Sequence, residues 1–357
     1  MKIGIYDPYL DDLGGGEKYM MTIASSLLDK NEVTVFWDKK EDIAAIETRF
    51  TLSLKTIKIA PNIFSNKFSF TTRMNITKNY DVLIILSDGS IPFVFSHKLF
   101  LHIQQPLPIK KYSSFKDKIK LKRVSEIFYN SEFTKQYNAP LFPKIKSAVI
   151  YPPVFFRKTN TKKENYIMHV GRFRVQNVPT DDFKKQSVMI ETFKKMVDQG
   201  LKNWKFILAA SVKKEDEALF ALLQKNAKEY PIEFHINKNN DELFNLYNKS
   251  KIYWHASGYG EDLEKHPEFA EHFGISTVEA MGAGVVPVVI NAGGQKEIVT
   301  DGKNGLLWNT TEELSNRTMQ LVNNQKLWSK LSEEAEKRAK DFSVEIFSER
   351  IQRLIQS

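Results

Sequence analysis

Residues 271–299 constrain the fold more than any other part of the chain; they read EHFGISTVEAMGAGVVPVVINAGGQKEIV. Ser276 and Thr277 are common N-cap residues, and Glu279 stands three positions after Ser276, which is the spacing of a capping box. Residues 285–290 are a short apolar, β-branched run, the pattern of a buried parallel strand. A glycine loop and a second helix start follow. The stretch predicts a helix–strand–loop–helix unit of an α/β domain, whose free backbone amides suit a phosphate.

Two carboxylates of this stretch, Glu271 and Glu279, stand eight positions apart. A pair at this spacing is common by chance. Here, however, Phe273-Gly274, the Glu-Ala-Met run, Pro287 and the glycine pair all follow in order. The whole pattern resembles the Glu-x7-Glu signature of the retaining glycosyltransferases of family four. The resemblance implies an α/β protein with the GT-B fold, in which two Rossmann-like domains with parallel sheets face a central cleft.

Length and composition fit two such domains. A chain of 357 residues is long enough for two α/β domains, and an apolar fraction of 42% supports packed cores. The sequence has no cysteine, which excludes disulfides and thiolate chemistry. It shows no secretory signal and no apolar run near the ~18 residues that a membrane-spanning helix needs. We therefore expect a cytoplasmic protein.

A stiff connector predicts the domain boundary. Residues 151–154 read Tyr-Pro-Pro-Val, and neither proline can continue a helix or donate a backbone hydrogen bond. The polar segment 159–165 follows. We predict a first Rossmann-like domain at 1–152 and a second at 153–340. The resemblance assigns acceptor binding to the first and nucleotide-sugar binding to the second, and implies that a last helix, within 341–357, crosses back to the first domain.

Candidate ligand residues of the first domain follow its predicted strands, which are expected at 2–6, 33–37, 53–59, 82–86, 98–103, 126–129 and 148–151. The triplet Gly14-Gly15-Gly16 precedes a helix, and His102 lies late in a strand. Alone, the triplet is typical of a flexible turn, and a strand histidine of a packed core. The resemblance implies that Gly15 and Gly16 approach the donor diphosphate, and that His102 reaches the catalytic cleft and binds the donor sugar near its C6 hydroxyl.

Candidate phosphate ligands of the second domain are cationic. Arg172 ends a predicted strand, and Lys185 starts a helix whose apolar stripe runs through residues 186–199. A cation opposes the dipole at a helix start, and an anionic ligand there would explain it. The resemblance implies that both bind the donor diphosphate, the arginine as a planar fork and the lysine as a point charge. The inserted loop 175–183 leaves Lys184 as the alternative to Lys185.

The resemblance also assigns the acids and the amides. Glu271 is expected to be catalytic, binding the sugar and steadying positive charge on its ring, and Glu279 to accept hydrogen bonds from the ribose. The amides of Gly274, Ile275 and Ser276 are expected to bind the diphosphate. The chain has no Asp-x-Asp motif, and its histidines fit no zinc spacing, so we expect an enzyme that needs neither a metal nor another cofactor.

The net charge of +9 is concentrated in the first half, because residues 1–150 hold 22 Lys and Arg against 15 Asp and Glu. The densest cluster lies within Lys110–Arg123 and comprises Lys110, Lys111, Lys116, Lys118, Lys120, Lys122 and Arg123. It is either a solvated lysine-rich surface or a patch for anionic lipid headgroups or an acceptor pyrophosphate, which would make the protein a peripheral membrane protein. The cluster lacks the aromatic interleaving of a single-strand nucleic-acid platform, and no nucleic-acid motif accompanies it, so we do not expect nucleic-acid binding.

The expected function is transfer of a hexose from a nucleotide sugar to a glycan or lipid-linked acceptor, with retained anomeric configuration. The extended stretch, with His255-Ala256, looks most like mannosyltransferases that act on lipid-linked oligosaccharides. The resemblance therefore favours GDP-mannose as the donor, with UDP-glucose or UDP-N-acetylglucosamine as the alternative. Two other functions stay open: a GT-B sugar-nucleotide epimerase, and a non-catalytic nucleotide-sugar-binding protein.

Overall fold

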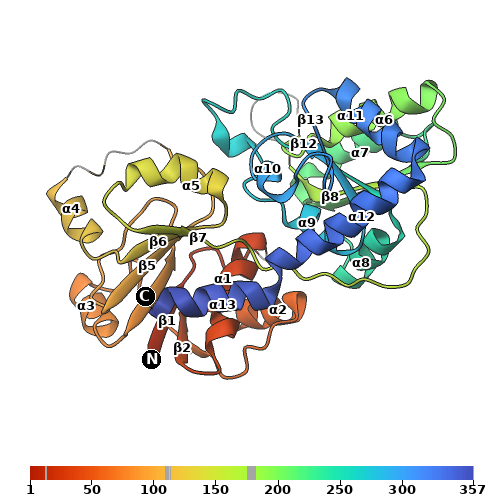
Figure 1. Ribbon diagram of the computed structural model, residues 1–357. Coiled ribbons are helices and arrows are strands. Elements are labelled where there is room, and N and C mark those ends of the chain that lie inside the picture. The colour runs from red at the N-terminus through yellow and green to blue at the C-terminus, as the bar shows by residue number, and fades with distance from the viewer. Residues whose placement is uncertain (13, 109–111, 113, 175–181, 357) are drawn as a thin grey trace. The chain divides into compact units, whose positions relative to one another are not determined.

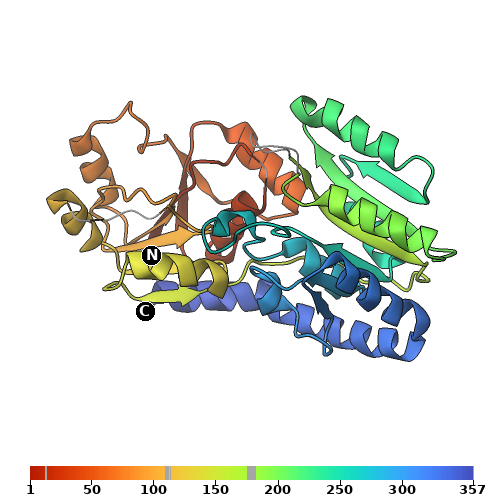
Figure 2. The same cartoon turned by 90° about the horizontal axis from the view of Figure 1, so that it is seen from above.

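The computed structural model describes residues 1–356 except 13, 109–111, 113 and 175–181. The chain divides into two compact units. The first combines Met1–Pro153 with Ser343–Ser357, and the second is Val154–Phe342. Each unit has helices packed along the strands of its own sheet (Figure 1), and Figure 2 shows the same elements from above.

Among the described residues, the first unit has a seven-stranded sheet in the order β3-β2-β1-β4-β5-β6-β7. All its neighbouring strands pair in parallel. The strands are β1 (Lys2–Tyr6), β2 (Glu32–Phe36), β3 (Lys58–Ala60), β4 (Val82–Leu86), β5 (Lys98–Ile103), β6 (Glu126–Tyr129) and β7 (Ser147–Val149). The order reverses between β1 and β4, the arrangement of a Rossmann-like sheet, whose ligands gather beyond the carboxyl ends of the strands.

One predicted strand of this unit, 53–59, is mostly wrong, because β3 begins only at Lys58. The preceding residues form turns instead. Thr51 ends a helix in the left-handed conformation, and the Leu54 amide donates to the Glu47 side chain at 2.8 Å. Leu54 is buried in the core, so its apolar character reflects a packed turn and not a strand.

The helices of the first unit are α1 (Gly15–Leu27), α2 (Lys40–Phe50), α3 (Phe70–Thr77), α4 (Phe115–Leu121), α5 (Glu132–Asn138), the 3₁₀ turn η1 (Ala139–Leu141) and α13 (Val344–Gln356). Ser131 caps α5, accepting a hydrogen bond from the Thr134 amide at 2.9 Å.

Helix α13 completes the core of the first unit, although 190 or so residues separate it from the rest of that unit. Its buried residues Phe347, Ile351, Leu354 and Ile355 recur at helical spacing and join the cluster formed by β1, β2 and α1. Figure 1 shows α13 beside α1. Burial of each such side chain contributes about 1.5–3 kcal/mol.

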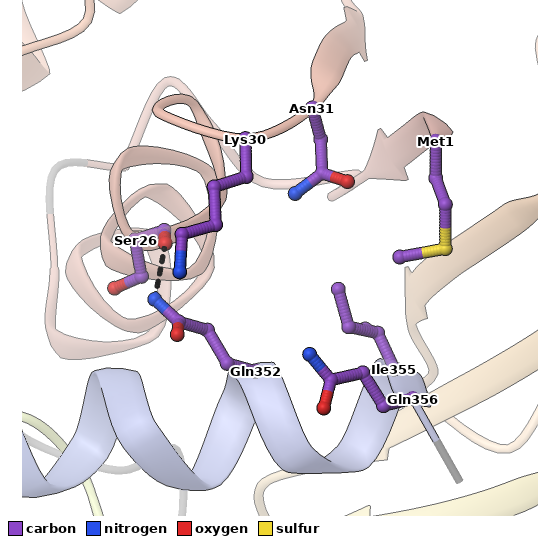
Figure 3. A pocket seen from close by; sticks show the side chains of 7 residues that line it. All are labelled: Met1, Ser26, Lys30, Asn31, Gln352, Ile355 and Gln356. Carbon is purple, nitrogen blue, oxygen red and sulfur yellow. Dashed lines mark hydrogen bonds between the residues drawn. The ribbon is translucent and has the colours of Figure 1, made fainter.

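Polar contacts also join α1 and α13. Ser26 and Ser348 hydroxyls lie 2.7 Å apart, and the Gln352 side-chain amide donates to the Ser26 carbonyl at 3.3 Å. Beside this contact is a hollow of about 70 Å³, lined by Met1, Ser26, Lys30, Asn31, Gln352, Ile355 and Gln356 (Figure 3). It is far smaller than the few hundred Å³ of a typical ligand pocket.

The described part of the second unit has a six-stranded parallel sheet in the order β10-β9-β8-β11-β12-β13. The strands are β8 (Tyr166–Phe173), β9 (Lys205–Val212), β10 (Ile232–Ile236), β11 (Ile252–His255), β12 (Val286–Ile290) and β13 (Leu306–Trp308). β8 and β11 are neighbours in the sheet, and the chain leaves them in opposite directions across it. Loops after these two strands therefore meet at the switch point, where α/β sheets bind ligands.

The helices of this unit are α6 (Gln186–Asp198), α7 (Glu217–Asn226), α8 (Asn240–Lys249), α9 (Ile275–Gly282), α10 (Gln295–Ile298), α11 (Thr311–Asn323) and α12 (Gln325–Ala339), with 3₁₀ turns η2 (Lys214–Asp216), η3 (Pro267–Phe269) and η4 (Lys340–Phe342). The predicted order of helix α9, strand β12 and helix α10 within residues 271–299 is confirmed. Every residue of β12 is buried, as its apolar run indicates.

Candidate active site

Glu271 lies at the carboxyl edge of the second sheet, where segments from β8 and β11 meet. Its Oε2 accepts a hydrogen bond from Lys184 Nζ at 2.6 Å and another from His255 Nε2 at 2.8 Å. The side chain of Glu271 is 18% exposed, whereas that of His255 is 1% exposed. The arrangement is a partly buried carboxylate that two donors hold from opposite segments of the chain.

These contacts determine the charge of Glu271. Burial alone would raise its pKa, but the Lys184 ammonium and the His255 hydrogen bond outweigh burial and lower the pKa well below the ordinary value. Burial also lowers the pKa of His255, against the opposing effect of Glu271. Glu271 is therefore ionised and His255 neutral near pH 7.

The neutral ring of His255 has a defined tautomer. A carboxylate cannot donate a hydrogen bond, so the hydrogen between the two groups sits on Nε2 of His255. Nδ1 is then an acceptor, and in the described part of the chain this buried atom has no hydrogen-bond partner.

Helix α9 begins at Ile275, and its N-cap lies two residues ahead of the predicted cap, Ser276. Gly274 is the N-cap, with φ of 122° and no side-chain cap, so the predicted capping box of Ser276 and Glu279 is wrong. Because glycine tolerates this φ, the helix begins before Ser276, and Ser276 lies within its first turn. Ser276 Oγ instead lies 2.7 Å from the Tyr253 hydroxyl, and Thr277 Oγ1 donates to Gln295 at 3.0 Å.

The start of α9 suits an anion. The first amides of a helix have no acceptor within it and lie at the positive end of its dipole. At α9 these amides belong to Ile275 and Ser276. Glu279 lies one turn further on, where its Oε2 accepts a hydrogen bond from the buried Tyr247 hydroxyl at 3.2 Å. Ser276 and Glu279, three positions apart, share one face of the helix.

The glycine pair after β12 holds Glu271 through backbone packing. The Gly294 amide donates to the Glu271 carbonyl at 2.8 Å. A Cβ on Gly294 would lie 2.5 Å from the Cα of Phe273, and one on Gly293 would collide with the Glu271 carbonyl. Glycine is needed here for close contact between two backbone segments.

Lys185 has a different partner from Lys184. Its Nζ donates to Glu261 Oε1 at 2.6 Å, and its side chain is only 5% exposed. The α6 start is also occupied, since the Asp182 carboxylate accepts hydrogen bonds from the Gln186 and Ser187 amides at 2.7 and 3.0 Å. An anion was expected at this helix start. In the structure, Glu261 supplies the negative charge at Lys185, and Asp182 supplies it at the helix amides.

Arg172 lies near the end of β8, at the same edge of the sheet as Lys184 and Glu271, and is partly buried. Most of the inserted loop, residues 175–181, lies outside the described residues. Within the described residues, no group of three or more His, Asp or Glu is arranged to hold a metal ion.

The first-unit candidates lie at the carboxyl edge of their own sheet. Gly15 and Gly16 open α1, and a Cβ on Gly16 would lie 2.7 Å from Gln104 Oε1, so glycine lets the helix start pack against β5's continuation. Gly14 is the N-cap, and its amide donates to the Glu17 carboxylate at 2.6 Å.

His102 is fully buried near the end of β5. Its ring stacks between Tyr19 and Phe128, with centroids 4.0 and 4.5 Å away, and Nδ1 lies 3.0 Å from the Phe128 carbonyl. Burial lowers the pKa of His102 to about 3, despite this hydrogen bond. The ring is therefore neutral with hydrogen on Nδ1, and Nε2 has no partner in the part of the chain that the structure describes.

Four residues at these sites were not predicted from the sequence, and three of them are hydrogen-bond partners of predicted site groups. Glu261 and Asp182 were not expected beside the lysines, and His255 was not expected beside Glu271. Asp7, at the end of β1, is a fourth: it is fully buried, and burial raises its pKa to about 7, with Glu17 and Asp11 adding to the effect against the Tyr9 amide hydrogen bond. Only position at a strand end could have suggested His255 and Asp7.

Comparison with known proteins identifies the family of the second unit. Residues 153–338, more than half of the chain, match the family described as Glycosyl transferases group 1. A GDP-Man:Man(3)GlcNAc(2)-PP-Dol alpha-1,2-mannosyltransferase of Dictyostelium discoideum is 26% identical over 228 residues, covering 60% of this chain and 42% of that protein. The protein of the same name from Xenopus laevis is 25% identical over 181 residues, covering 48% and 35%. The chain thus matches less than half the length of these relatives.

Solved structures share the fold at low identity. Anabaena Alr3699/HepE in complex with UDP has a TM-score of 0.73 at 17% identity, covering 100% of both chains. A glycosyltransferase from Rickettsia africae ESF-5 has a TM-score of 0.74 at 18% identity, covering 99% of this chain and 97% of that one. The predicted GT-B fold class, with two Rossmann-like α/β units, is confirmed. The chain belongs to the glycosyl transferases group 1 family.

Proposed function

We propose that the protein is a metal-independent, retaining hexosyltransferase that moves a sugar from a nucleoside-diphosphate donor to a glycan or lipid-linked acceptor. The observation that carries the proposal is the ionised Glu271, held by Lys184 and His255 at the switch point of the second sheet. A fixed carboxylate beside free helix amides supplies both signs of charge that sugar transfer needs.

The second unit is proposed as the donor-binding part. Arg172, Lys185 and the amides of Gly274, Ile275 and Ser276 would bind the diphosphate. Glu279 would accept hydrogen bonds from the ribose hydroxyls. The roles predicted for Gly15, Gly16 and His102 of the first unit, and acceptor binding by that unit, stay predictions.

The chemistry follows from charge development. Cleavage of the bond between the anomeric carbon and the diphosphate leaves positive character on the sugar ring and adds negative charge to the phosphate. Ionised Glu271 would stabilise the ring, and the cations and α9 amides would stabilise the phosphate. The acceptor hydroxyl attacks the anomeric carbon from the face that the phosphate leaves, and the phosphate oxygen takes the hydroxyl proton. The configuration is retained.

GDP-mannose is the favoured donor, because the two relatives described above are named as GDP-Man mannosyltransferases. A UDP-sugar is the alternative, because the solved Anabaena protein binds UDP and UDP-glucose. The same two relatives, by name, act on a dolichyl-diphosphate-linked oligosaccharide, which supports a lipid-linked acceptor.

We further propose that the protein works in the cytoplasm at an anionic membrane surface, through α4. None of the described helices is long and apolar enough to span a bilayer. Helix α4 carries Lys116, Lys118 and Lys120, beside Phe115, whose side chain is 78% exposed. Exposed aromatic and basic side chains together suit a lipid headgroup region. Lys110 and Lys111 of the predicted cluster lie outside the described residues.

The test is turnover of GDP-mannose, UDP-glucose and UDP-N-acetylglucosamine, each with and without a polyprenyl-diphosphate oligosaccharide, in buffer containing EDTA. We expect acceptor-dependent release of the nucleoside diphosphate from one donor, and an α-linked product by NMR. Release of a rearranged sugar without acceptor would establish the epimerase instead. Binding of a nucleotide sugar without any turnover would establish the non-catalytic alternative. An inverted linkage, or activity only after a divalent metal is restored, would refute the mechanism.

A further inference from the structure

Both hydrogen-bond donors of Glu271 meet the same carboxylate oxygen. Lys184 Nζ and His255 Nε2 lie 2.6 and 2.8 Å from Oε2. Lys184 comes from the segment after β8 and His255 is the last residue of β11, so the donors approach from two separate segments. Two donors on one oxygen hold that oxygen in place more firmly than a single contact would.

The other oxygen of Glu271 remains for a ligand. Within the described residues, no hydrogen bond joins Oε1 to the protein. This atom is not among the fully buried polar atoms that lack a partner, and the side chain as a whole is 18% exposed. Oε1 is therefore reachable, whereas Oε2 already accepts two hydrogen bonds.

His255 itself does not reach the ligand space. Its side chain is 1% exposed, and β11 lies between β8 and β12 in the sheet. Its neutral ring offers a single N–H, and that N–H points at Glu271. Lys184, by contrast, has three N–H groups and a flexible stem, so it can serve a phosphate as well as Glu271. His255 is the donor whose geometry is set by the fold.

We propose that His255 is a positioning residue for sugar transfer: its Nε2–H holds Glu271 so that Oε1 faces the donor sugar. This role rests on the proposed function, because it assigns Oε1 of Glu271 to the sugar ring. A carboxylate that is already oriented stabilises the developing ring charge without having to reorganise during the reaction.

Substitution by the two side-chain amides separates this role from simple packing. The amide nitrogen of glutamine reaches the position of Nε2 in histidine, while that of asparagine corresponds to Nδ1. His255→Gln therefore keeps the donor to Glu271, and His255→Asn removes it. Loss of one hydrogen bond to a charged group corresponds to a rate decrease of roughly 10- to 100-fold.

A second buried histidine is the matched control. His169 is fully buried, its ring centroid lies 5.9 Å from that of His255, and its Nδ1 contacts the Trp254 carbonyl at 2.9 Å. His169→Asn retains a donor at the Nδ1 position and has no bond to Glu271. We expect its kcat to stay close to that of the unaltered protein.

The kinetic experiment measures kcat, the donor KM and the Kd of the free nucleoside diphosphate for each folded variant. We expect His255→Asn to lower kcat by the stated factor with an unchanged diphosphate Kd, and His255→Gln to recover most of the rate. Equal kcat in His255→Asn and the unaltered protein would overturn the proposal. So would a His255→Gln protein of normal melting temperature that is no faster than His255→Asn.

Nitrogen NMR of histidine-labelled protein tests the positioning without turnover. We expect His255 to show a neutral ring with hydrogen on Nε2, and this resonance to shift in Glu271→Gln. A charged ring, or hydrogen on Nδ1, would overturn the role of His255 whatever the kinetics show. If no nucleotide sugar is turned over and no nucleoside diphosphate binds, the proposed function fails, and the spectrum alone decides whether His255 orients Glu271.

Discussion

Lys185 Nζ lies 2.6 Å from Oε1 of Glu261, so a carboxylate of the protein occupies the lysine that is proposed to bind the donor diphosphate. Glu261 belongs to the segment between β11 and α9, 76 positions from Lys185 in the sequence. Its side chain is 29% exposed, and that of Lys185 is 5% exposed. A diphosphate must either displace Glu261 or share the lysine with it.

Glu261→Gln is expected to tighten binding of a nucleoside diphosphate. The variant removes the negative charge that competes for Lys185 and lies near any phosphate beside it. A partly exposed ion pair contributes about 1 kcal/mol, so the expected gain in affinity is about three- to tenfold. Isothermal titration with GDP and UDP measures it.

Glu264→Gln is the control for this variant, because it removes the same charge from an exposed position of the same segment. We expect its affinity to match that of the unaltered protein. Weaker binding by Glu261→Gln would show that Glu261 holds Lys185 in position and does not compete with the ligand.

Asp7→Asn is expected to stabilise the protein at pH 8 and to have little effect at pH 4. Burial raises the pKa of Asp7 from 3.8 to about 7 in the folded state, so the folded protein binds this proton more tightly than the unfolded chain. The associated stability is fully present below pH 3.8 and is lost as the pH rises through about 7. The loss amounts to at most ~4 kcal/mol, and asparagine avoids it.

Thermal melting from pH 4 to 8 checks this expectation. Asp29→Asn, at an exposed position of the same unit that does not contribute to the raised pKa of Asp7, is the control and should follow the unaltered protein. A difference between Asp7→Asn and the unaltered protein that does not grow with pH would contradict a raised pKa of Asp7.

Gly274→Ala is expected to lower the free energy of unfolding by about 2–4 kcal/mol. The φ of Gly274 is 122°, and an added Cβ would lie 2.5 Å from Nε2 of the buried Gln295. Gly302→Ala separates strain from crowding, since Gly302 has φ of 71° but no atom within 4 Å of an added Cβ. Urea unfolding should show the larger loss for Gly274→Ala; equal losses would mean that Gln295 moves aside freely.

Reversal of the α4 charges is expected to weaken binding to anionic vesicles. Lys116, Lys118 and Lys120 replaced by Glu should reduce the affinity for vesicles containing phosphatidylglycerol by more than about tenfold, because each lysine near such a surface contributes about 1 kcal/mol. Sedimentation with vesicles measures it, and binding should vanish on neutral phosphatidylcholine.

A matched reversal in the second unit tests whether position matters. Lys202, Lys326 and Lys330 are exposed, and their replacement by Glu changes the net charge by the same amount. We expect little change in vesicle binding. Equal losses from the two triple variants would show that only net charge attracts the membrane, and that α4 has no special role.

Periodic segments of this chain were predictable, and contacts between distant loops were not. The β-branched run of β12 and the apolar stripe of α6 each follow from spacing along a few residues. The start of α9 was predicted two residues too late. Ser276 and Thr277 are common capping residues, but the observed N-cap is Gly274, whose positive φ cannot be read from the sequence. Local sequence patterns predict helices and strands well, except where a glycine allows a helix to begin at a different residue.

The ion pairs of the candidate site depend on the strand order. Lys184 and Glu271 are 87 positions apart, and they meet because β8 and β11 are neighbours in the sheet. Nothing in the spacing of either segment indicates which lysine pairs with which acid. The resemblance supplied Glu271 and Lys185 as candidates, but not Glu261, because the motifs that carry the resemblance do not include residues 257–270.

The return of α13 to the first unit also fixes an order for biosynthesis. The second unit is continuous, Val154–Phe342, and can close its core once those residues have left the ribosome. The first unit, although translated earlier, must wait with an open apolar surface until Phe347 and Ile351 emerge. During synthesis, the apolar surface of the first unit that α13 will cover thus stays exposed longest, and chaperones would bind there.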